Sequence, residues 1–310
     1  MAQTEKTKRL LEQLEAKYAA TGQSLEVHLE GLLHQELTTY WDYIQTDALL
    51  NLQIKRTTLP DEMVFIVYHQ INELIFKMIL WEIDQVAHCD DLKPEFFTER
   101  LMRVSRYFDL LTNSFNIMTD GMEVAQYLKF RNTLAPASGF QSAQYRKIEF
   151  ASTELINLID ARFRTTIDRT TTYEYALDHL YWQAAGKDHK TGKKSYLLTS
   201  FEAKYKNEFV AFTQEYNTIN LYSKFKTLTA SVKTNPELIK AMRHYDYTVN
   251  ITWVMAHYTT ANKYLNDGKK VTESTGGSDW VKYMHPKYQK RIFFPELWSE
   301  DELTNWGKDA

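Results

Sequence analysis

The chain has 310 residues, of which 44% are hydrophobic and 25% are charged, and its formal net charge is −3. This composition is typical of a globular protein with a large core, and the slight acidic balance argues against a broad basic face for nucleic acid. Because Gly (10) and Pro (6) punctuate strands and turns, their scarcity favours long helices.

The chain has one cysteine, Cys89. A single thiol forms neither an internal disulfide nor a zinc site built from cysteines, so we expect a reducing, cytoplasmic environment. The first twenty residues contain no apolar stretch of signal-peptide length, which agrees with that expectation.

Near the N-terminus, residues 1–20 alternate charges with apolar side chains, as an exposed amphipathic helix would, and a break follows at Gly22. Further helices are predicted over residues 25–37 and 38–53, the second with aromatic side chains on one side. We therefore predict an N-terminal helical arm over residues 1–55.

The next stretch, FIVYHQINELIFKMILWEI, starts at Phe65 and is apolar around most of a helical circumference. Pro60, Asp61 and Glu62 precede it and suit the positively polarised start of a helix. At about 100° per residue, His69 lies on its apolar face, so we expect this face to point into a core and the imidazole to have a specific role. Too many polar residues interrupt the stretch for a membrane span.

The rest of the chain continues the helical period, without strand alternation or an internal repeat. We predict an all-α fold and a single domain over residues 1–310, with a basic, mobile surface loop over residues 187–195. Helices are predicted over residues 96–118, 123–134, 140–163, 196–221 and 236–265, with a Gly/Ser/Thr-rich stretch over 266–280 and a short tail over 292–303.

The sequence lacks several motifs of known chemistry. None of the nine histidines has a glutamate three residues before it, and His-Glu-x-x-His, P-loop, GxGxxG and GxSxG patterns are absent. His69, and His257 four residues after Trp253, each lie on an apolar helical face. Each alone is best explained as a core histidine bonded to a backbone carbonyl. Together they fit a haem pocket, which needs an apolar slot and one neutral imidazole on the iron.

Arg131 follows Tyr127 by one helical turn and precedes a short corner. An arginine beside an aromatic surface can bind a carboxylate through two parallel hydrogen bonds, although a surface arginine in solvent is the commoner case. Arg146 and Lys147 are better explained as surface residues. The STGGS stretch over residues 274–278 is either a flexible turn or a loop that binds an anion.

Five blocks resemble tryptophan 2,3-dioxygenases, in that family's order. They are TYWDYIQTDALLNLQ, DEMVFIVYHQINELIFK, QYLKFRNTLAPASGFQSAQYRKIEF, STGGS after WVMAH, and FFPELW. The resemblance implies a helical bundle that encloses a b-type haem, ferrous in the active form, in a homotetramer whose N-terminal arms are exchanged. It also implies insertion of O₂ across the indole C2–C3 bond of L-tryptophan to give N-formylkynurenine, the first step of tryptophan catabolism by the kynurenine route.

The resemblance assigns roles to individual residues. His257 would be the axial ligand of the haem iron, and His69 the distal histidine that accepts the indole N–H. Arg131 would bind the substrate carboxylate, and Thr275 the amino-acid head group. Further substrate contacts would be Phe65, Tyr127, Ser138, Tyr40 and Tyr43, the last two over a neighbouring subunit's site, and further haem contacts would be Ser138, Gly139, Phe115 and Trp253.

Two differences from the family leave other functions open. The loop reads STGGSDW where the family has GTGGSSG, and Val254, Met255 and Ala256 stand before His257 where the family has arginines. One alternative is a haem monooxygenase of the same fold that acts on another indole or aromatic amino acid. The other is a non-catalytic haem-binding helical protein.

Overall fold

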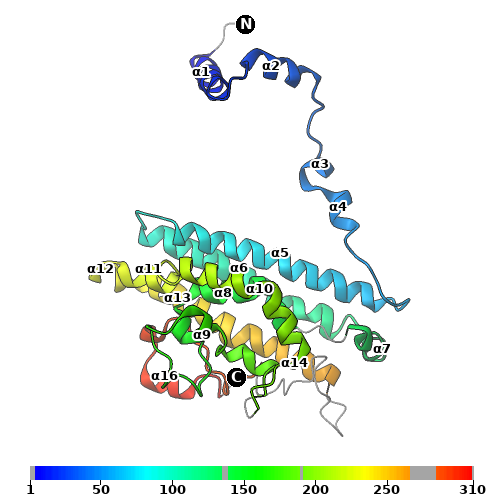
Figure 1. Ribbon diagram of the computed structural model, residues 1–310, viewed down its shortest axis with the longest axis vertical. Helices are drawn as coiled ribbons and strands as arrows, with labels where there is room; N and C mark the ends of the chain where they lie inside the picture. Colours follow the sequence, from blue (N-terminus) through cyan, green and yellow to red (C-terminus); the bar gives the residue numbers. More distant parts are fainter. Residues whose placement is uncertain (1–3, 135–138, 189–190, 266–283, 309–310) are drawn as a thin grey trace. The chain divides into compact units, whose positions relative to one another are not determined.

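A computed structural model gives the fold of the chain (Figure 1). Within the described residues there is no β-strand, and helices are the dominant element, so the predicted all-α fold is confirmed. The chain separates into two compact units, Met1–Ile54 and Lys55–Ala310. That both units belong to one domain remains a prediction. The described residues are 4–134, 139–188, 191–265 and 284–308.

The first unit contains four helices, and none of their described side chains is buried. The amphipathic helix predicted for the first twenty residues is confirmed, and the hydroxyl of Thr4 caps its start. The helices are α1 (Glu5–Ala19), α2 (Leu25–His34), α3 (Tyr40–Ile44) and α4 (Thr46–Leu50).

The single helix predicted over residues 38–53 is wrong. Gln45 has a left-handed backbone (φ +60°) that separates α3 from α4. Its N–H donates to the carbonyl of Trp41, and its side-chain amide donates to the carbonyl of Asp42, which closes α3 after five residues. The helix end is therefore set locally, by the left-handed backbone of Gln45.

The second unit is built on two long helices that lie side by side and are joined by a short turn (Figure 1). These are α5 and α6; α8 packs along α5, whereas α13 and α14 pack along α6. The bounds are α5 (Asp61–Ala87), α6 (Pro94–Thr119), α7 (Val124–Leu134), η1 (Gly139–Gln141), α8 (Ala143–Ser152), η2 (Leu155–Leu158), α9 (Tyr173–Leu177), η3 (Tyr181–Ala185), α10 (Tyr196–Tyr216), α11 (Leu221–Thr227), α12 (Ala230–Lys233), α13 (Pro236–Tyr247), η4 (Thr248–Thr252), α14 (Trp253–Leu265), η5 (Pro295–Leu297) and α16 (Glu300–Asn305).

Helix α5 forms one wall of the core. Ile75, Ile79 and Ile83 recur at four-residue spacing and are buried, as an amphipathic helix requires. By length and composition alone, α5 could also cross a membrane. Its polar side chains nevertheless make tertiary contacts: Glu82 accepts a hydrogen bond from Arg100 of α6 (2.8 Å). These contacts identify α5 as a helix of the bundle; the cytoplasmic location remains a prediction.

The helix predicted over residues 140–163 is wrong beyond Ser152. Thr153 is extended, and its hydroxyl donates to the carbonyl of Phe293 (2.6 Å). The hydroxyl of Ser152 pairs with that of Tyr245 (2.7 Å). Since these partners lie far along the chain, the local apolar period carries no sign of the helix end.

The helix predicted over residues 236–265 is present but interrupted. Its middle is the π-helical turn η4, which is buried along most of its length. An extra residue in a helical turn rotates the helix beyond that turn, so η4 sets the direction of Trp253 and His257 relative to α13. Such π turns occur often at functional sites.

The carboxylate of Asp246 joins α13 to the C-terminal segment. It is fully buried and accepts hydrogen bonds from the N–H groups of Phe293 (2.9 Å) and Phe294 (3.0 Å), from Trp298 Nε1 (3.0 Å) and from Asn250 Nδ2 (2.8 Å). Four donors on one carboxylate make this contact a main attachment of that segment.

Replacing Asp246 by alanine leaves these four buried donors without an acceptor. We expect a loss of about 3–5 kcal/mol in the free energy of unfolding, measured by urea denaturation. Asp246→Asn, which keeps one acceptor oxygen, should lose less. Equal stability of the alanine variant and the wild type would contradict this role.

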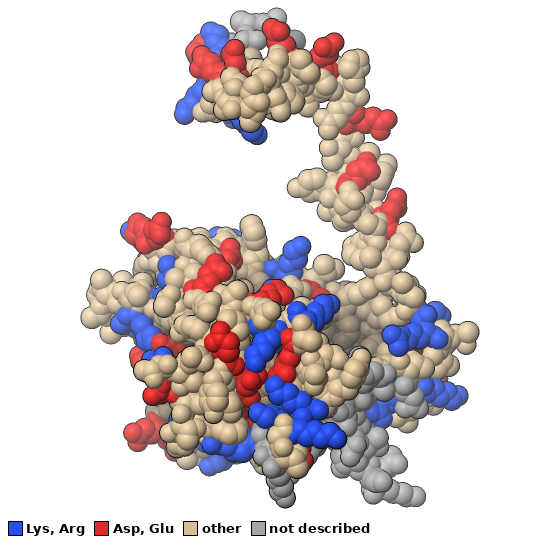
Figure 2. All heavy atoms as spheres, viewed as in Figure 1, with Lys and Arg blue, Asp and Glu red and all other residues tan. Residues whose placement is uncertain are grey.

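Charged side chains of the second unit are of mixed sign on the face shown in Figure 2. Half-exposed ion pairs such as Arg103–Glu99 (2.6 Å) each contribute about 0–1 kcal/mol to the free energy of unfolding. The stability of the unit therefore comes mainly from core packing.

Candidate active site

A second apolar cluster adjoins the main core at Trp253 and is formed by side chains of α5, α6, α7 and α14, with Met122 just before α7. Four predicted contact residues, Phe65, Phe115, Tyr127 and Trp253, belong to it. The structure therefore brings together residues that are up to 188 positions apart in the sequence (253 − 65). Its buried members are Tyr68, Phe115, Met118, Met122 and Tyr264.

His69 lies at the edge of this cluster on α5. Its Nδ1 is 2.7 Å from the carbonyl oxygen of Phe65. A carbonyl can only accept, so Nδ1 carries the proton, and Nε2 of the neutral ring is left as an acceptor. The rings of Phe65 and His69 lie 4.1 Å apart.

The expectation that His69 points into a packed core is wrong, because the side chain is exposed. Desolvation by the surrounding protein nevertheless lowers its pKa below 6.5. The imidazole is therefore neutral at pH 7 and accessible to a small molecule.

His257 lies on α14, one turn after Trp253. Its ring stacks on Phe115 (centroids 5.5 Å apart, planes at 17°) and lies 5.9 Å from Trp253. Within the described part of the chain, no hydrogen bond to its ring nitrogens is found. Desolvation, and then the charges of His69 and Arg291, lower the pKa of His257 to about 4. The ring is neutral at pH 7, and its nitrogen lone pair can bind a metal.

Gly139 borders His257 on the side of η1. A Cβ built on Gly139 would lie 4.0 Å from Cε1 of His257, with no heavy atom nearer. The described residues contain no group of three or more His, Cys, Asp and Glu that could hold a metal ion. A single neutral imidazole among aromatic rings, beside a residue without a side chain, fits the axial ligand of a haem.

Arg131 supplies a buried cation on α7, with 7% of the residue exposed. Its side chain hydrogen-bonds the hydroxyl of Tyr127, whose pKa is raised by burial. Tyr127 in turn lies 6.2 Å from Phe65, ring to ring. The cation therefore stands next to the second apolar cluster, where a ligand with an aromatic ring and a carboxylate could contact both.

For four other predicted site residues the structure gives no position relative to this cluster. Ser138 and Thr275, like the rest of the STGGSDW loop, lie outside the described residues. Tyr40 and Tyr43 belong to α3 in the first unit, where they are 73% and 79% exposed. Their contact with a neighbouring subunit remains a prediction.

Sequence reasoning missed a buried ionic cluster, which we define as Tyr145, Arg146, Glu149, Tyr181 and Arg291. The interpretation of Arg146 as a surface residue is wrong, because only 3% of it is exposed. Its Nη1 lies 2.9 Å from Glu149, three residues further along α8. The three-residue spacing of Arg146 and Glu149 on one helix was the only sequence feature that could have indicated this ion pair. The other members, Tyr181 and Arg291, are remote in sequence.

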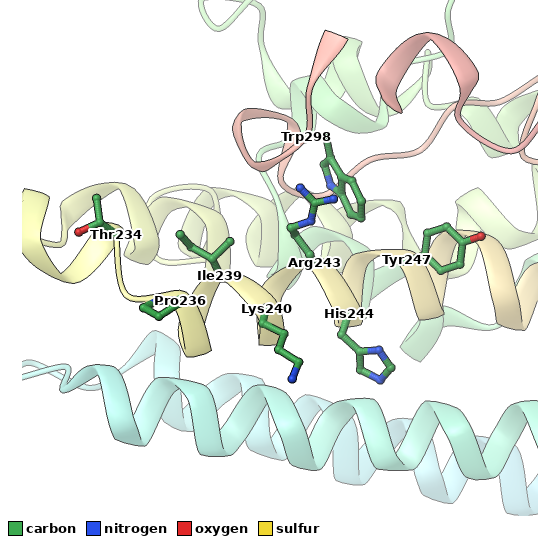
Figure 3. A pocket seen from close by; sticks show the side chains of 8 residues that line it. All are labelled: Thr234, Pro236, Ile239, Lys240, Arg243, His244, Tyr247 and Trp298. Atoms are coloured by element: carbon green, nitrogen blue, oxygen red, sulfur yellow. The ribbon is translucent and has the colours of Figure 1, made fainter. Parts of the chain in front are cut away.

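The surface also carries a groove of about 610 Å³ along α13 (Figure 3). It contains none of the predicted site residues, and Arg243 in its wall stacks on Trp298 (4.2 Å) and bonds the carbonyl of Leu297 (2.9 Å). His69, His257 and Arg131 are not among the residues that line this groove. It is lined by Thr234, Pro236, Ile239, Lys240, Arg243, His244, Tyr247 and Trp298.

Comparison with known proteins agrees with this geometry. Residues 30–179 match the family described as tryptophan 2,3-dioxygenase. A tryptophan 2,3-dioxygenase of Bacillus thuringiensis subsp. konkukian is 31% identical over 278 residues, which cover 86% of this chain and 92% of that protein. The enzyme of that name from Bacillus anthracis is also 31% identical over 278 residues. That from Geobacillus thermodenitrificans is 28% identical over 290 residues, which cover 88% of this chain and 96% of its own.

Proposed function

Because the chain belongs to the tryptophan 2,3-dioxygenase family, we propose that it adds both atoms of O₂ across the indole C2–C3 bond of L-tryptophan. The product is N-formylkynurenine. The observation that carries this proposal is the pair of neutral imidazoles, His69 and His257, at one aromatic cluster that also adjoins the buried cation of Arg131.

The proposed cofactor is haem b, held through its iron by His257. When bound, the ferrous haem supplies the activation of O₂. The contribution of the chain is to keep the ligating ring neutral and oriented, through the stack on Phe115 and the packing of Trp253. Gly139 leaves room beside the imidazole, and Ser138 next to it is the further proposed haem contact.

The proposed role of His69 is to position the indole. Its Nε2 is the free acceptor of a neutral ring and can take the indole N–H, while Phe65 packs against the aromatic plane. Orientation of this kind holds the substrate close to its reactive geometry without any change in covalent bonding. We do not assign His69 a proton-abstracting role.

The proposed recognition of the amino-acid part uses Arg131, with Tyr127 beside it. The guanidinium is buried and faces a water-poor aromatic surface, where a charge-assisted hydrogen bond to the substrate carboxylate is strong. Thr275 is the proposed contact for the head group from the loop that follows α14.

The proposed assembly is a homotetramer that exchanges its N-terminal arms, in which Tyr40 and Tyr43 reach a neighbouring subunit's site. Residues 25–54 carry five acidic residues and neither Lys nor Arg. Their large apolar side chains are exposed, Leu33 by 84% and Leu37 by 91%. An exposed apolar segment of this size needs a protein surface to cover it, and a second copy of the chain can provide one.

The deciding experiment uses the haem-loaded, anaerobically reduced protein. L-Tryptophan and ¹⁸O₂ are added, and the product is read by mass spectrometry. Two labelled oxygen atoms in N-formylkynurenine are expected. One labelled atom would instead establish the monooxygenase of the same fold, and haem binding without turnover would favour the non-catalytic alternative.

His69→Ala should impair the use of L-tryptophan more than that of 1-methyltryptophan, which has no indole N–H to pair. An unpaired buried N–H costs about 1–3 kcal/mol, so kcat/KM for L-tryptophan should fall by about 5- to 150-fold. His179→Ala is the matched control, because its Nδ1 makes the same contact with the carbonyl four residues before it (2.7 Å).

The pH dependence of the wild-type enzyme gives a second test of the role of His69. Because the pKa of His69 is lowered, wild-type kcat/KM should stay constant above pH 6.5 and fall only below that value, as the acceptor nitrogen gains a proton. Equal losses for the two substrates in His69→Ala would contradict the N–H contact.

A further inference from the structure

The buried ionic cluster joins three distant parts of the second unit. The hydroxyl of Tyr181 accepts hydrogen bonds from Nη1 of Arg146 and Nη1 of Arg291, both at 2.8 Å, and donates to Oε1 of Glu149 (2.5 Å). Only 5% of Arg291 and none of Glu149 is exposed. Because apolar side chains could join these elements without burying charge, the charges call for a reason beyond packing.

The positive charge of Arg291 is only partly balanced. Among the described residues, its carboxylate partner is Glu149, which lies 3.4 Å from Arg291 and closer, at 2.9 Å, to Arg146. The other hydrogen-bond partners of Arg291 are the hydroxyls of Tyr145 and Tyr181. Burial raises the pKa of Tyr145 to about 12 and that of Tyr181 well above 10, so both hydroxyls stay neutral.

A chain of contacts through Tyr145 and Trp253 links Arg291 to His257. The hydroxyl of Tyr145 is 3.4 Å from Arg291, and its ring stacks on Trp253 at 4.9 Å. Trp253 lies one turn before His257, at 5.9 Å from its ring. The chain from residue 248 to residue 262 contains no Lys, Arg, Asp or Glu. Two cationic side chains contact Tyr145 in this chain of contacts: Arg291 at its hydroxyl (3.4 Å) and Arg146 over its ring (4.7 Å). Because Glu149 lies closer to Arg146 than to Arg291, Arg291 is the less balanced of the two cations.

We propose that Arg291 is a positioning residue whose fixed charge, held behind His257 through Tyr145 and Trp253, favours the ferrous over the ferric state of the bound haem. This inference rests on the proposed function, and on His257 as the axial ligand. Iron loses one positive charge on reduction, and a nearby buried cation repels the ferric form more than the ferrous form. Because a guanidinium keeps its proton at every relevant pH, the effect does not depend on pH.

The test is an anaerobic spectroelectrochemical titration of the haem-loaded full chain, without L-tryptophan or O₂. Arg291→Gln should lower the ferrous-to-ferric ratio at a fixed potential by about tenfold, which is a shift of about 59 mV to more negative midpoint potential. Glu149→Gln removes the opposing negative charge and should shift the potential in the positive direction. Arg291→Lys should stay close to the wild type.

The cluster around Glu82 provides a matched control. Glu82 is also buried and accepts hydrogen bonds from Arg100 (2.8 Å) and Tyr107 (3.3 Å), but these contacts do not include Tyr145, Trp253 or His257. Arg100→Gln should therefore lower the melting temperature without moving the potential. If Arg291 had a purely structural role, Arg291→Gln would likewise lower the melting temperature and leave the midpoint potential unchanged.

The sign of the two shifts decides the inference. Shifts in the same direction for Arg291→Gln and Glu149→Gln, or no shift in either, would overturn it. If Arg291→Gln does not fold, the positive shift of the nearly isosteric Glu149→Gln decides alone. Failure of the wild type to bind haem would overturn the proposed function instead, and so the two failures are distinguishable.

Discussion

Replacing His257 by alanine is expected to abolish stable haem binding and, with it, the turnover of L-tryptophan. His257 is the neutral imidazole that stacks on Phe115, and the variant would keep the aromatic walls but lose the bond to iron. We expect the affinity for haem to fall at least about 100-fold, which corresponds to about 2.7 kcal/mol. The measurement is the Soret absorbance that remains with the protein after gel filtration.

Two further measurements make this result specific. Free imidazole should restore part of the histidine-type haem spectrum in His257→Ala, because it can occupy the space of the lost ring. His285→Ala, which removes a buried imidazole whose pKa is also lowered, should keep its haem. A normal histidine-ligated spectrum in His257→Ala would show that another residue binds the iron.

Replacing Arg131 by leucine is expected to raise the KM for L-tryptophan by about 100-fold, since a charge-assisted pair of hydrogen bonds to the carboxylate is worth about 1.5–3 kcal/mol. The haem spectrum should be unchanged, because the predicted contact is with the substrate and not with the iron. The preference for L-tryptophan over tryptamine, which has no carboxylate, should largely disappear.

The neighbouring residue Lys129 provides a control on the same helix. Lys129 is exposed, so Lys129→Leu removes a cation from α7 without touching the second apolar cluster. Arg131→Lys keeps the charge but not the two parallel hydrogen bonds. Its KM for L-tryptophan should lie between those of the wild type and Arg131→Leu. An unchanged KM in Arg131→Leu would place the carboxylate elsewhere.

Local sequence was sufficient for most of the fold. The apolar period and the scarcity of Gly and Pro predicted the long helices, and α5, α6 and α7 lie where that period placed them. The same reasoning selected His69 and His257 from nine histidines, because an imidazole on an apolar helical face stands out.

Features that depend on residues far apart in the chain became visible only in the folded protein. The end of α8 requires Phe293 and Tyr245, and the burial of Arg146 requires Arg291 and Tyr181. A periodic pattern reports which side of a helix meets the core, but not which polar group lies there. Buried charges and helix ends are set by such partners, because a polar group out of water must find a hydrogen bond wherever the fold supplies one.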